Sequence, residues 1–133
     1  MTMKTFGILG AGTWGTALAN MLENMGHHCC VWSPIKEEVE SITSTRKHSH
    51  LPGSIIHDNI EFTTDIKYTV EGKDYVLVAT PSVFVRSTSE TIKPFISLSS
   101  CTAIILFLSG QIHLNFALII WGYLHRADKT LIK

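Results

Sequence analysis

The feature that most constrains this chain is a turn of three glycines between an apolar run and a helix-forming segment. Gly10, Gly12 and Gly15 match the pattern G-x-G-x-x-G within the stretch ILGAGTWGTALANML, residues 8–22. The preceding run at residues 6–9 is short and apolar, which predicts a buried parallel strand. Because strand, turn and helix follow one another as in a dinucleotide-binding unit, we favour that interpretation over a simple connecting turn.

Each glycine has its own expected role in such a turn. Gly10 can adopt the backbone angles of a tight strand-to-helix turn, and Gly12 has no side chain to keep a pyrophosphate from the backbone. Gly15 allows the helix to pack closely on the strand. The free N–H groups of the first helical turn, at the positive end of the helix dipole, would bind the phosphates.

The rest of the pattern alternates helices and strands. The first helix is predicted over residues 16–25, with Ala17, Leu18, Met21, Leu22 and Met25 on its inward face. The segments expected after it are a cap at Gly26, a strand at 29–32, a short helix at 37–44, a loop at 45–53, a weak strand at 59–63, a helix from the cap Asp65 to near Gly72, a buried strand at 75–79 and a helix at 82–92 that stops at Pro94. This order predicts an α/β fold, a Rossmann-like doubly wound parallel sheet. A ligand would then lie over the carboxyl ends of the strands, where residues 10–15, Ser33 and residues 81–84 converge.

The overall composition limits the class of protein. The 133 residues suit a single domain, and eleven basic and eleven acidic residues cancel, so no nucleic-acid partner is expected. Three cysteines, two of them adjacent, make no disulfide framework. The first strand begins too close to Met1 for a signal peptide. We therefore expect a reduced, cytoplasmic setting.

The seven histidines raise the question of a metal site, above all in the run His27, His28, Cys29 and Cys30. Adjacent residues entering a strand point to opposite faces, so these side chains cannot readily converge on one ion. No second ligand pair at zinc-finger spacing exists in the sequence. We expect no metal site.

The end of the second strand bears on which dinucleotide would bind. An acid that binds the adenosine ribose is usual about twenty residues past the glycines, but residues 32–36 (Trp-Ser-Pro-Ile-Lys) include no acid before Glu37. A carboxylate there would repel a 2′-phosphate, so its absence leaves NADP possible beside NAD. Ser33 and Lys36 could serve such a phosphate, or Ser33 could be a plain loop residue.

The polar loop at residues 45–53 (TRKHSHLPG) ends in a Pro-Gly turn. Its basic side chains could contact an anion, or could belong to an ordinary solvated loop. The candidates are Arg46, Lys47, His48 and His50.

Several motifs together resemble one known family. The segments GILGAGTWGTALANML, VWS, TRKHSHLPG, FTTDI and VLVATPSVFVRS follow the order seen in bacterial-type NAD(P)-dependent glycerol-3-phosphate dehydrogenases, over roughly residues 4–96. The resemblance implies reduction of dihydroxyacetone phosphate to sn-glycerol 3-phosphate with NAD or NADP as cofactor, in the service of phospholipid synthesis. It implies cofactor contacts from Gly10, Ala11, Gly12, Thr13, Trp14, Gly15, Ser33, Pro34, Pro81 and Phe84. Trp14 and Phe84 could instead be core residues.

The chain departs from that family after its fifth predicted strand. The family carries a Lys-Gly-Ile/Leu-Glu motif there, but the apolar run at residues 102–108 is followed by Ser-Gly-Gln-Ile at 109–112. A helical domain that holds a second lysine and the substrate phosphate contacts is also missing. The sequence therefore offers no catalytic residue to assign.

Residues 95–125 contain no Asp, Glu, Lys or Arg. We therefore divide the chain into a dinucleotide-binding domain at residues 1–100 and an atypical apolar tail at 101–133, interpreted as a frameshifted or truncated end. A transmembrane helix at 103–124 is the alternative, against which Gln111, His113 and Asn115 argue.

The function expected from the sequence is the NAD(P)-binding part of a glycerol-3-phosphate dehydrogenase, inactive alone. A small phosphorylated substrate would bind only if the missing domain were supplied. Two alternatives stay open: another Rossmann dehydrogenase of small hydroxy acids, and a non-catalytic nucleotide-binding module.

Overall fold

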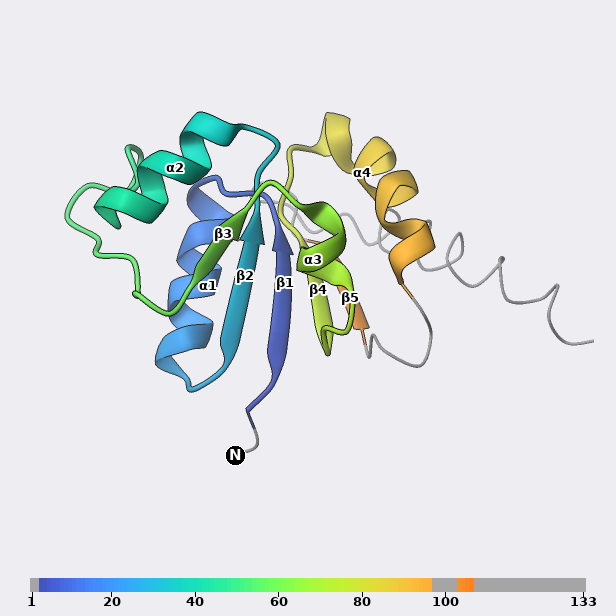
Figure 1. Cartoon of the computed structure of the whole chain (residues 1–133), viewed down its shortest axis with the longest axis horizontal. Coiled ribbons are helices and arrows are strands. Elements are labelled where there is room, and N and C mark those ends of the chain that lie inside the picture. Colours follow the sequence, from blue (N-terminus) through green and yellow to red (C-terminus); the bar gives the residue numbers. More distant parts are fainter. Residues whose placement is uncertain (1–2, 97–102, 107–133) are drawn as a thin grey trace, which may run out of the picture.

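The computed structural model describes residues 3–96 and 103–106, which form a parallel sheet between two layers of helices (Figure 1). Its five strands lie in the order β3-β2-β1-β4-β5. Their bounds are β1 Thr5–Leu9, β2 His28–Trp32, β3 Glu61–Thr63, β4 Tyr75–Val78 and β5 Ala103–Leu106. All four pairings are parallel, with Ile8 of β1 opposite Val31 of β2 and Leu77 of β4. The predicted doubly wound parallel sheet is confirmed.

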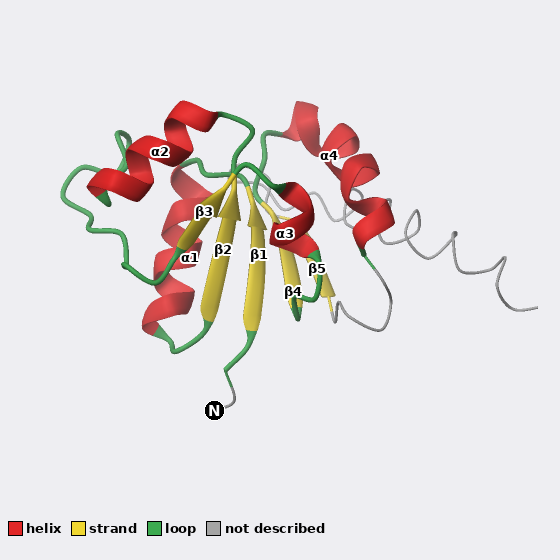
Figure 2. Ribbon diagram, in the orientation of Figure 1, coloured by secondary structure: helices red, strands yellow, loops and turns green. Residues whose placement is uncertain are grey.

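Helices cover both faces of this sheet, as Figure 2 shows. Their bounds are α1 Thr13–Asn24, α2 Lys36–Thr45, α3 Ile66–Val70 and α4 Val85–Ile92, with 3₁₀ turns η1 Ser82–Phe84 and η2 Lys93–Phe95. The helix predicted at 82–92 is thus a 3₁₀ turn followed by a short α-helix. Each of the strands β1 to β4 is followed by a crossover segment that leads to the next parallel strand, which is how parallel strands must be joined.

The core is divided by the sheet into two apolar clusters. On one face, Phe6 and Ile8 of β1 pack with Ala19 and Leu22 of α1. On the other face, Leu9 of β1 joins a cluster of buried residues from α3, β4 and α4: Val70, Val76, Val78, Val85 and Ile92. Alternate residues of β1 therefore serve opposite layers, as the pleat of a strand requires.

Helix α1 differs from its prediction in both its start and its rotation. It begins at Thr13, directly after Gly12, rather than at residue 16. Its buried residues are Gly15, Thr16, Ala19, Leu22 and Glu23, while Met21 and Met25 are half exposed. Of the predicted inward face, Leu22 is buried and Leu18 packs against the core, but Ala17, Met21 and Met25 are exposed, so the prediction was right for two of its five residues. Close packing of the helix on β1 turns its small residues inward, and this outweighs the hydrophobicity of the longer methionine side chains.

Both predicted helix caps are confirmed. Gly26 follows α1 with a φ of +91°, its N–H donates to the carbonyl oxygen of Glu23, and the N–H of His27 donates to that of Leu22. These two bonds make a Schellman motif, in which glycine avoids the strain of a left-handed residue. At the start of α3, the side chain of Asp65 accepts a hydrogen bond from the backbone N–H of Tyr68 at 3.2 Å.

Strand β5 lies within the apolar run that was expected to form the fifth strand. It pairs with β4 from Ala103 to Leu106, so these four residues do not begin a helix. The rest of the proposed transmembrane alternative, the motif position at 109–112 and most of the predicted tail lie outside the described residues. Within the described residues, no helix combines the length and apolarity needed to cross a membrane.

Candidate nucleotide-binding site

A cleft of about 830 Å³ lies where the loops after β1, β2 and β4 meet at the carboxyl ends of these strands. Its lining residues are Gly10, Ala11, Gly12, Thr13, Trp14, Trp32, Ser33, Pro34, Ile35, Glu38, Ile66, Ala79, Thr80, Pro81, Phe84, Ser87, Thr88 and Thr91. Nine of the ten predicted cofactor residues are among them, and the tenth, Gly15, lies buried under the turn. The volume is that of a site for a cofactor-sized ligand.

The turn after β1 passes so close to β4 that only glycine fits at its first position. Gly10 has a φ of +125°, and a Cβ atom there would lie 2.7 Å from the carbonyl oxygen of Ala79. The N–H of Gly10 donates to the carbonyl oxygen of Trp32 at 2.9 Å, which also joins the turn to the end of β2. Both steric and conformational constraints therefore require glycine here.

Gly15 and Gly12 differ in what a side chain would meet. A Cβ atom on Gly15 would overlap the carbonyl oxygen of Gly10, so the absence of a side chain lets α1 pack directly against the turn. A Cβ atom on Gly12 would meet nothing within 4 Å, and Gly12 itself lines the cleft. Gly12 is therefore not required by packing; it leaves open space where a ligand could reach the backbone.

The N-terminus of α1 points its unpaired donors at this space. Gly12 is the N-cap, no side chain caps the helix, and its first turn carries no acidic residue. The first N–H groups of a helix have no intrahelical partner, and the positive end of the dipole adds to their attraction for an anion. A phosphate group fits such a position.

His48 belongs to the polar loop after α2, but its side chain is buried and bonds to the glycine turn. Its imidazole is buried, with Nε2 2.9 Å from the carbonyl oxygen of Ala11. Its Nδ1 accepts the N–H of His50 at 3.1 Å, so Nε2 carries the proton and donates to Ala11. Thr16 adds a second bond from its hydroxyl to the same carbonyl oxygen at 3.3 Å.

Arg46 likewise organises its own loop. It adopts a left-handed conformation with a φ of +54° at the end of α2, and its Nη1 donates to the carbonyl oxygens of Ile60 and His57 at 2.7 and 3.3 Å. Neither Arg46 nor His48 lines the cleft. Both side chains bond to backbone carbonyl oxygens, so they position the backbone around the cleft.

Ser33 is buried at the end of β2 and brings a carboxylate to the cleft. Its hydroxyl donates to Oε2 of Glu38 at 2.6 Å and accepts the N–H of Ile35 at 3.2 Å. Glu38 lines the cleft, whereas Lys36 does not and lies 3.6 Å from Glu40 on the exposed side of α2. Glu38 lies inside α2, beyond residues 32–36 where the sequence pattern places a ribose-binding acid, so the pattern does not reveal it.

Two aromatic side chains border the cleft rather than the core. Trp14 and Phe84 are each 57% exposed and line the space on the β1 and β4 sides. The alternative in which they are core residues is wrong. Exposed aromatic rings beside a cleft provide flat apolar surfaces on which a ring of a ligand can stack.

Thr80 lines the cleft and carries a buried hydroxyl without a hydrogen-bond partner among the described residues. Thr80 is only 8% exposed. A buried hydroxyl without a partner is costly, and such groups in native proteins usually mark a functional site. The open space at Gly12 and the uncapped N-terminus of α1 are the features that fit the phosphates of a dinucleotide.

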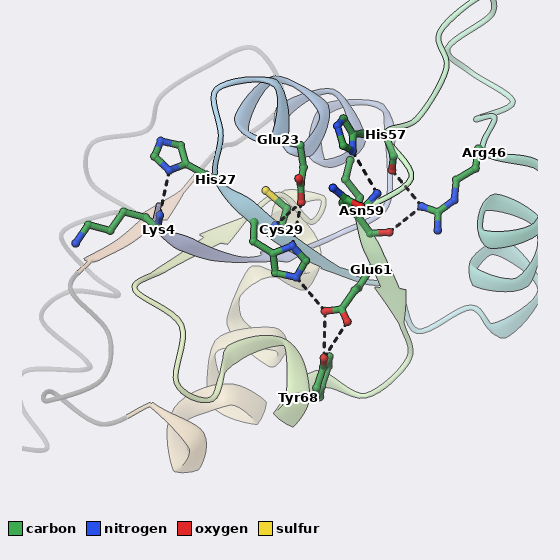
Figure 3. A network of polar contacts seen from close by, with 11 residues as sticks. Lys4, Glu23, His27, Cys29, Arg46, His57, Asn59, Glu61 and Tyr68 are labelled. Atoms are coloured by element: carbon green, nitrogen blue, oxygen red, sulfur yellow. Dashed lines mark hydrogen bonds and ion pairs between the residues drawn. The ribbon is translucent and has the colours of Figure 1, made fainter. Parts of the chain in front are cut away.

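Residues 27–30, the histidine and cysteine run, lie at the amino end of β2, away from the cleft, and take part in a network of polar contacts (Figure 3). His28 lies 3.2 Å from Glu23 and 3.3 Å from Glu61, while Glu23 also accepts the N–H of Cys29 at 2.9 Å. Cys29 belongs to the apolar cluster beside α1, and Cys30 points to the other face. The described residues contain no group of three potential ligands arranged to hold a metal ion.

Burial keeps both of these thiols protonated. It raises the pKa of Cys29 to about 12, with a further contribution from the charge of Glu23, and it raises the pKa of Cys30 to about 11. The thiolate is the reactive form of cysteine, so neither side chain is a nucleophile near neutral pH.

Comparison with known proteins agrees with this geometry. A family model described as the N-terminus of NAD-dependent glycerol-3-phosphate dehydrogenase matches residues 5–113. The chain is 50% identical over 94 residues to glycerol-3-phosphate dehydrogenase (NAD(P)+) 2 of Lactobacillus delbrueckii subsp. bulgaricus, a match that covers 71% of this chain and 28% of that relative. It is 44% identical over 95 residues to glycerol-3-phosphate dehydrogenase (NAD(P)+) of Agathobacter rectalis, with the same two coverages.

A solved structure shows the same fold. The crystal structure of glycerol-3-phosphate dehydrogenase from Coxiella burnetii superposes with a TM-score of 0.76 and 25% identity, over 90% of this chain and 38% of that one. The matched region spans 28% of the length of both sequence relatives. The chain therefore belongs to the NAD(P)-dependent glycerol-3-phosphate dehydrogenase family and corresponds to the N-terminal region of those enzymes, with NAD or NADP as the cofactor.

Proposed function

We propose that this chain binds the dinucleotide of a cytoplasmic glycerol-3-phosphate dehydrogenase, which reduces dihydroxyacetone phosphate to sn-glycerol 3-phosphate for phospholipid synthesis. The observation that carries the proposal is the bare turn at Gly12, which opens the uncapped N-terminus of α1 to the cleft. Backbone N–H groups placed in this way bind a pyrophosphate without needing a charged side chain. The family match supplies the reaction.

The side chains around the cleft have complementary roles in this proposal. Trp14 and Phe84 would confine the rings of the dinucleotide, and Thr80 would give its free hydroxyl to a polar group. The nicotinamide would supply the hydride when bound, and the residues that line the cleft would hold the dinucleotide in place.

No catalytic residue is assigned to the described part of the chain. The described residues that line the cleft include no lysine, arginine or histidine, and reduction of a ketone needs a group that protonates or polarises the oxygen. We infer that this group, and the cation that holds the substrate phosphate, come from other segments of the enzyme.

The same observation favours one second candidate, a nucleotide-binding module without turnover. The assay that separates the two candidates is the loss of NADH absorbance on addition of dihydroxyacetone phosphate to monodisperse protein, measured with and without the remaining domains of a matched relative. This chain alone is expected to show no turnover whether it is a fragment of the enzyme or a nucleotide-binding module. Addition of the remaining domains of a matched relative restores turnover only if the chain belongs to an enzyme.

The dinucleotide site itself is tested by Gly12→Val, measured by fluorescence titration with NADH and NADPH. The valine side chain would occupy the open space of the cleft without meeting the protein, so binding is expected to fall by more than about tenfold while circular dichroism stays unchanged. Ala17→Val is the matched control, because Ala17 is an exposed residue of α1 that does not line the cleft. Equal affinity of Gly12→Val and the parent chain would refute the assignment.

A further inference from the structure

The cleft carries a single charge, and it lies at one end. Among the described residues that line it, Glu38 is the only one with an acidic or basic side chain. Glu38 stands on the first turn of α2, immediately after the loop from β2. A ligand in this part of the cleft therefore meets a carboxylate and no compensating cation.

The carboxylate is held in place rather than free to swing away. The hydroxyl of Ser33 donates to Oε2 of Glu38 at 2.6 Å, a short bond of the kind formed by a hydroxyl to a charged oxygen. Ser33 is itself buried, and its oxygen accepts the N–H of Ile35. The hydroxyl proton of Ser33 is therefore already donated to Glu38 and is not available to a phosphate group. The second carboxylate oxygen, Oε1 of Glu38, has no hydrogen-bond partner among the described residues.

The place of Glu38 determines which part of a dinucleotide it would meet. With the pyrophosphate on the N-terminus of α1, one nucleoside extends over the end of β2 and the other over the end of β4. In parallel sheets of this strand order, the nucleoside at β2 is the adenosine. The ribose hydroxyls of that nucleoside would then lie beside Ser33, Pro34 and Glu38.

We propose that Glu38 is the residue that selects NAD(H) over NADP(H), by accepting a hydrogen bond from the adenosine 2′-hydroxyl and repelling a 2′-phosphate. This inference rests on the proposed function and deepens it. Lys36, which could have offset the repulsion, lies on the exposed side of α2 beside Glu40. A 2′-phosphate in this position would meet like charge in a partly enclosed cleft, where screening by solvent is weak.

The test compares the dissociation constants of NADH and NADPH for three versions of the full chain. The parent is expected to bind NADH at least about tenfold more tightly than NADPH, the worth of one hydrogen bond to a charged group. Glu38→Gln keeps the size of the side chain but removes its charge, so the ratio should fall toward one as NADPH binding improves. Glu37→Gln, an exposed position on the same helix turn that does not line the cleft, is the matched control and should leave the ratio unchanged.

A second measurement isolates the adenosine half. Displacement of bound NADH by 5′-AMP and by adenosine 2′,5′-bisphosphate should favour 5′-AMP in the parent chain, and this preference should shrink in Glu38→Gln. Ser33→Ala, which releases the carboxylate while keeping its charge, should reduce the discrimination less than Glu38→Gln does. The fold of each variant is checked by circular dichroism.

The possible failures are distinguishable. If neither dinucleotide binds the parent chain, the proposed function is wrong and the inference falls with it. If both bind but with equal affinity, with NADPH preferred, or with a ratio that Glu38→Gln does not change, the cleft is a dinucleotide site and the role of Glu38 is wrong.

Discussion

The imidazole of His48 donates from Nε2 to the carbonyl oxygen of Ala11 across 37 residues of sequence, at 2.9 Å. The bond joins the loop after α2 to the turn that faces the cleft. Because both ring nitrogens are bonded, the side chain fixes the position of one carbonyl group and thereby the plane of the next peptide. A residue outside the cleft therefore helps to set the direction of the N–H groups that face it.

We predict that His48→Ala lowers both stability and cofactor binding. Loss of a buried hydrogen bond and of the imidazole volume should reduce the free energy of unfolding by about 2 kcal/mol, measured by urea denaturation. NADH affinity should fall as well, because the turn loses a support. His50→Ala is the comparison variant: His50 is exposed, its backbone bond to His48 is kept, and only a ring contact with His48 at 5.8 Å between centroids is lost, so its effect should be smaller. Identical urea midpoints for His48→Ala and the parent would contradict this role.

Thr80→Val should separate binding from stability. Replacing an unpartnered buried hydroxyl by a methyl group of similar shape is expected to leave the free energy of unfolding unchanged or raise it by up to about 1 kcal/mol. NADH affinity should fall about 2- to 10-fold if the hydroxyl bonds to the ligand.

Thr69→Val is the matched contrast for this experiment. The Thr69 hydroxyl donates to the carbonyl oxygen of Asp65 at 2.9 Å and accepts from the Cys30 thiol, and Thr69 does not line the cleft. Loss of the Thr69 hydroxyl should lower the free energy of unfolding without changing the affinity for NADH. An unchanged affinity in Thr80→Val would mean that its hydroxyl does not face the dinucleotide.

Acid stability should depend on Asp74. The backbone N–H of Thr5 and its hydroxyl both donate to Oδ2 of Asp74, at 2.9 and 3.1 Å, and these bonds hold the pKa of that carboxyl below its usual range. A lowered pKa in the folded state means that the ionised form stabilises the fold above the unfolded pKa, and that this contribution is lost as the pH falls through the folded value.

The measurement is the urea midpoint of the parent and of Asp74→Asn between pH 7 and pH 2.5. The parent should be the more stable at pH 7. The difference should shrink as the pH falls below about 4, where the unfolded carboxyl becomes protonated, and vanish below the lower pKa of the folded state. A difference that stays constant over this range would show that the charge of Asp74 has no part in it.

The sequence was sufficient for those features that depend on local backbone geometry. The turn at Gly10 and the cap at Gly26 both have positive φ angles, which few other residues tolerate, so the glycines mark them directly. Asp65 could be predicted in the same way, because an aspartate just before a helix commonly caps the N-terminus of that helix. The strands were found from their apolar runs.

The features missed by the sequence analysis depend on contacts between distant segments. The rotation of α1 follows from the overlap that any side chain on Gly15 would cause with Gly10, and hydrophobic periodicity does not record this constraint. His48 and Glu38 lie on segments whose composition is that of a solvated surface. Only the path of the loops brings one to Ala11 and the other to Ser33.

The close approach of Gly10 to Ala79 has a consequence for how fast a ligand can bind. The turn is joined to β2, β4 and the loop of His48, so its conformation is already settled before a ligand arrives. Little conformational entropy remains to be lost on binding, and no segment of the turn has to rearrange first. Association should therefore be a single fast step, with differences in affinity among variants of the cleft appearing in the dissociation rate.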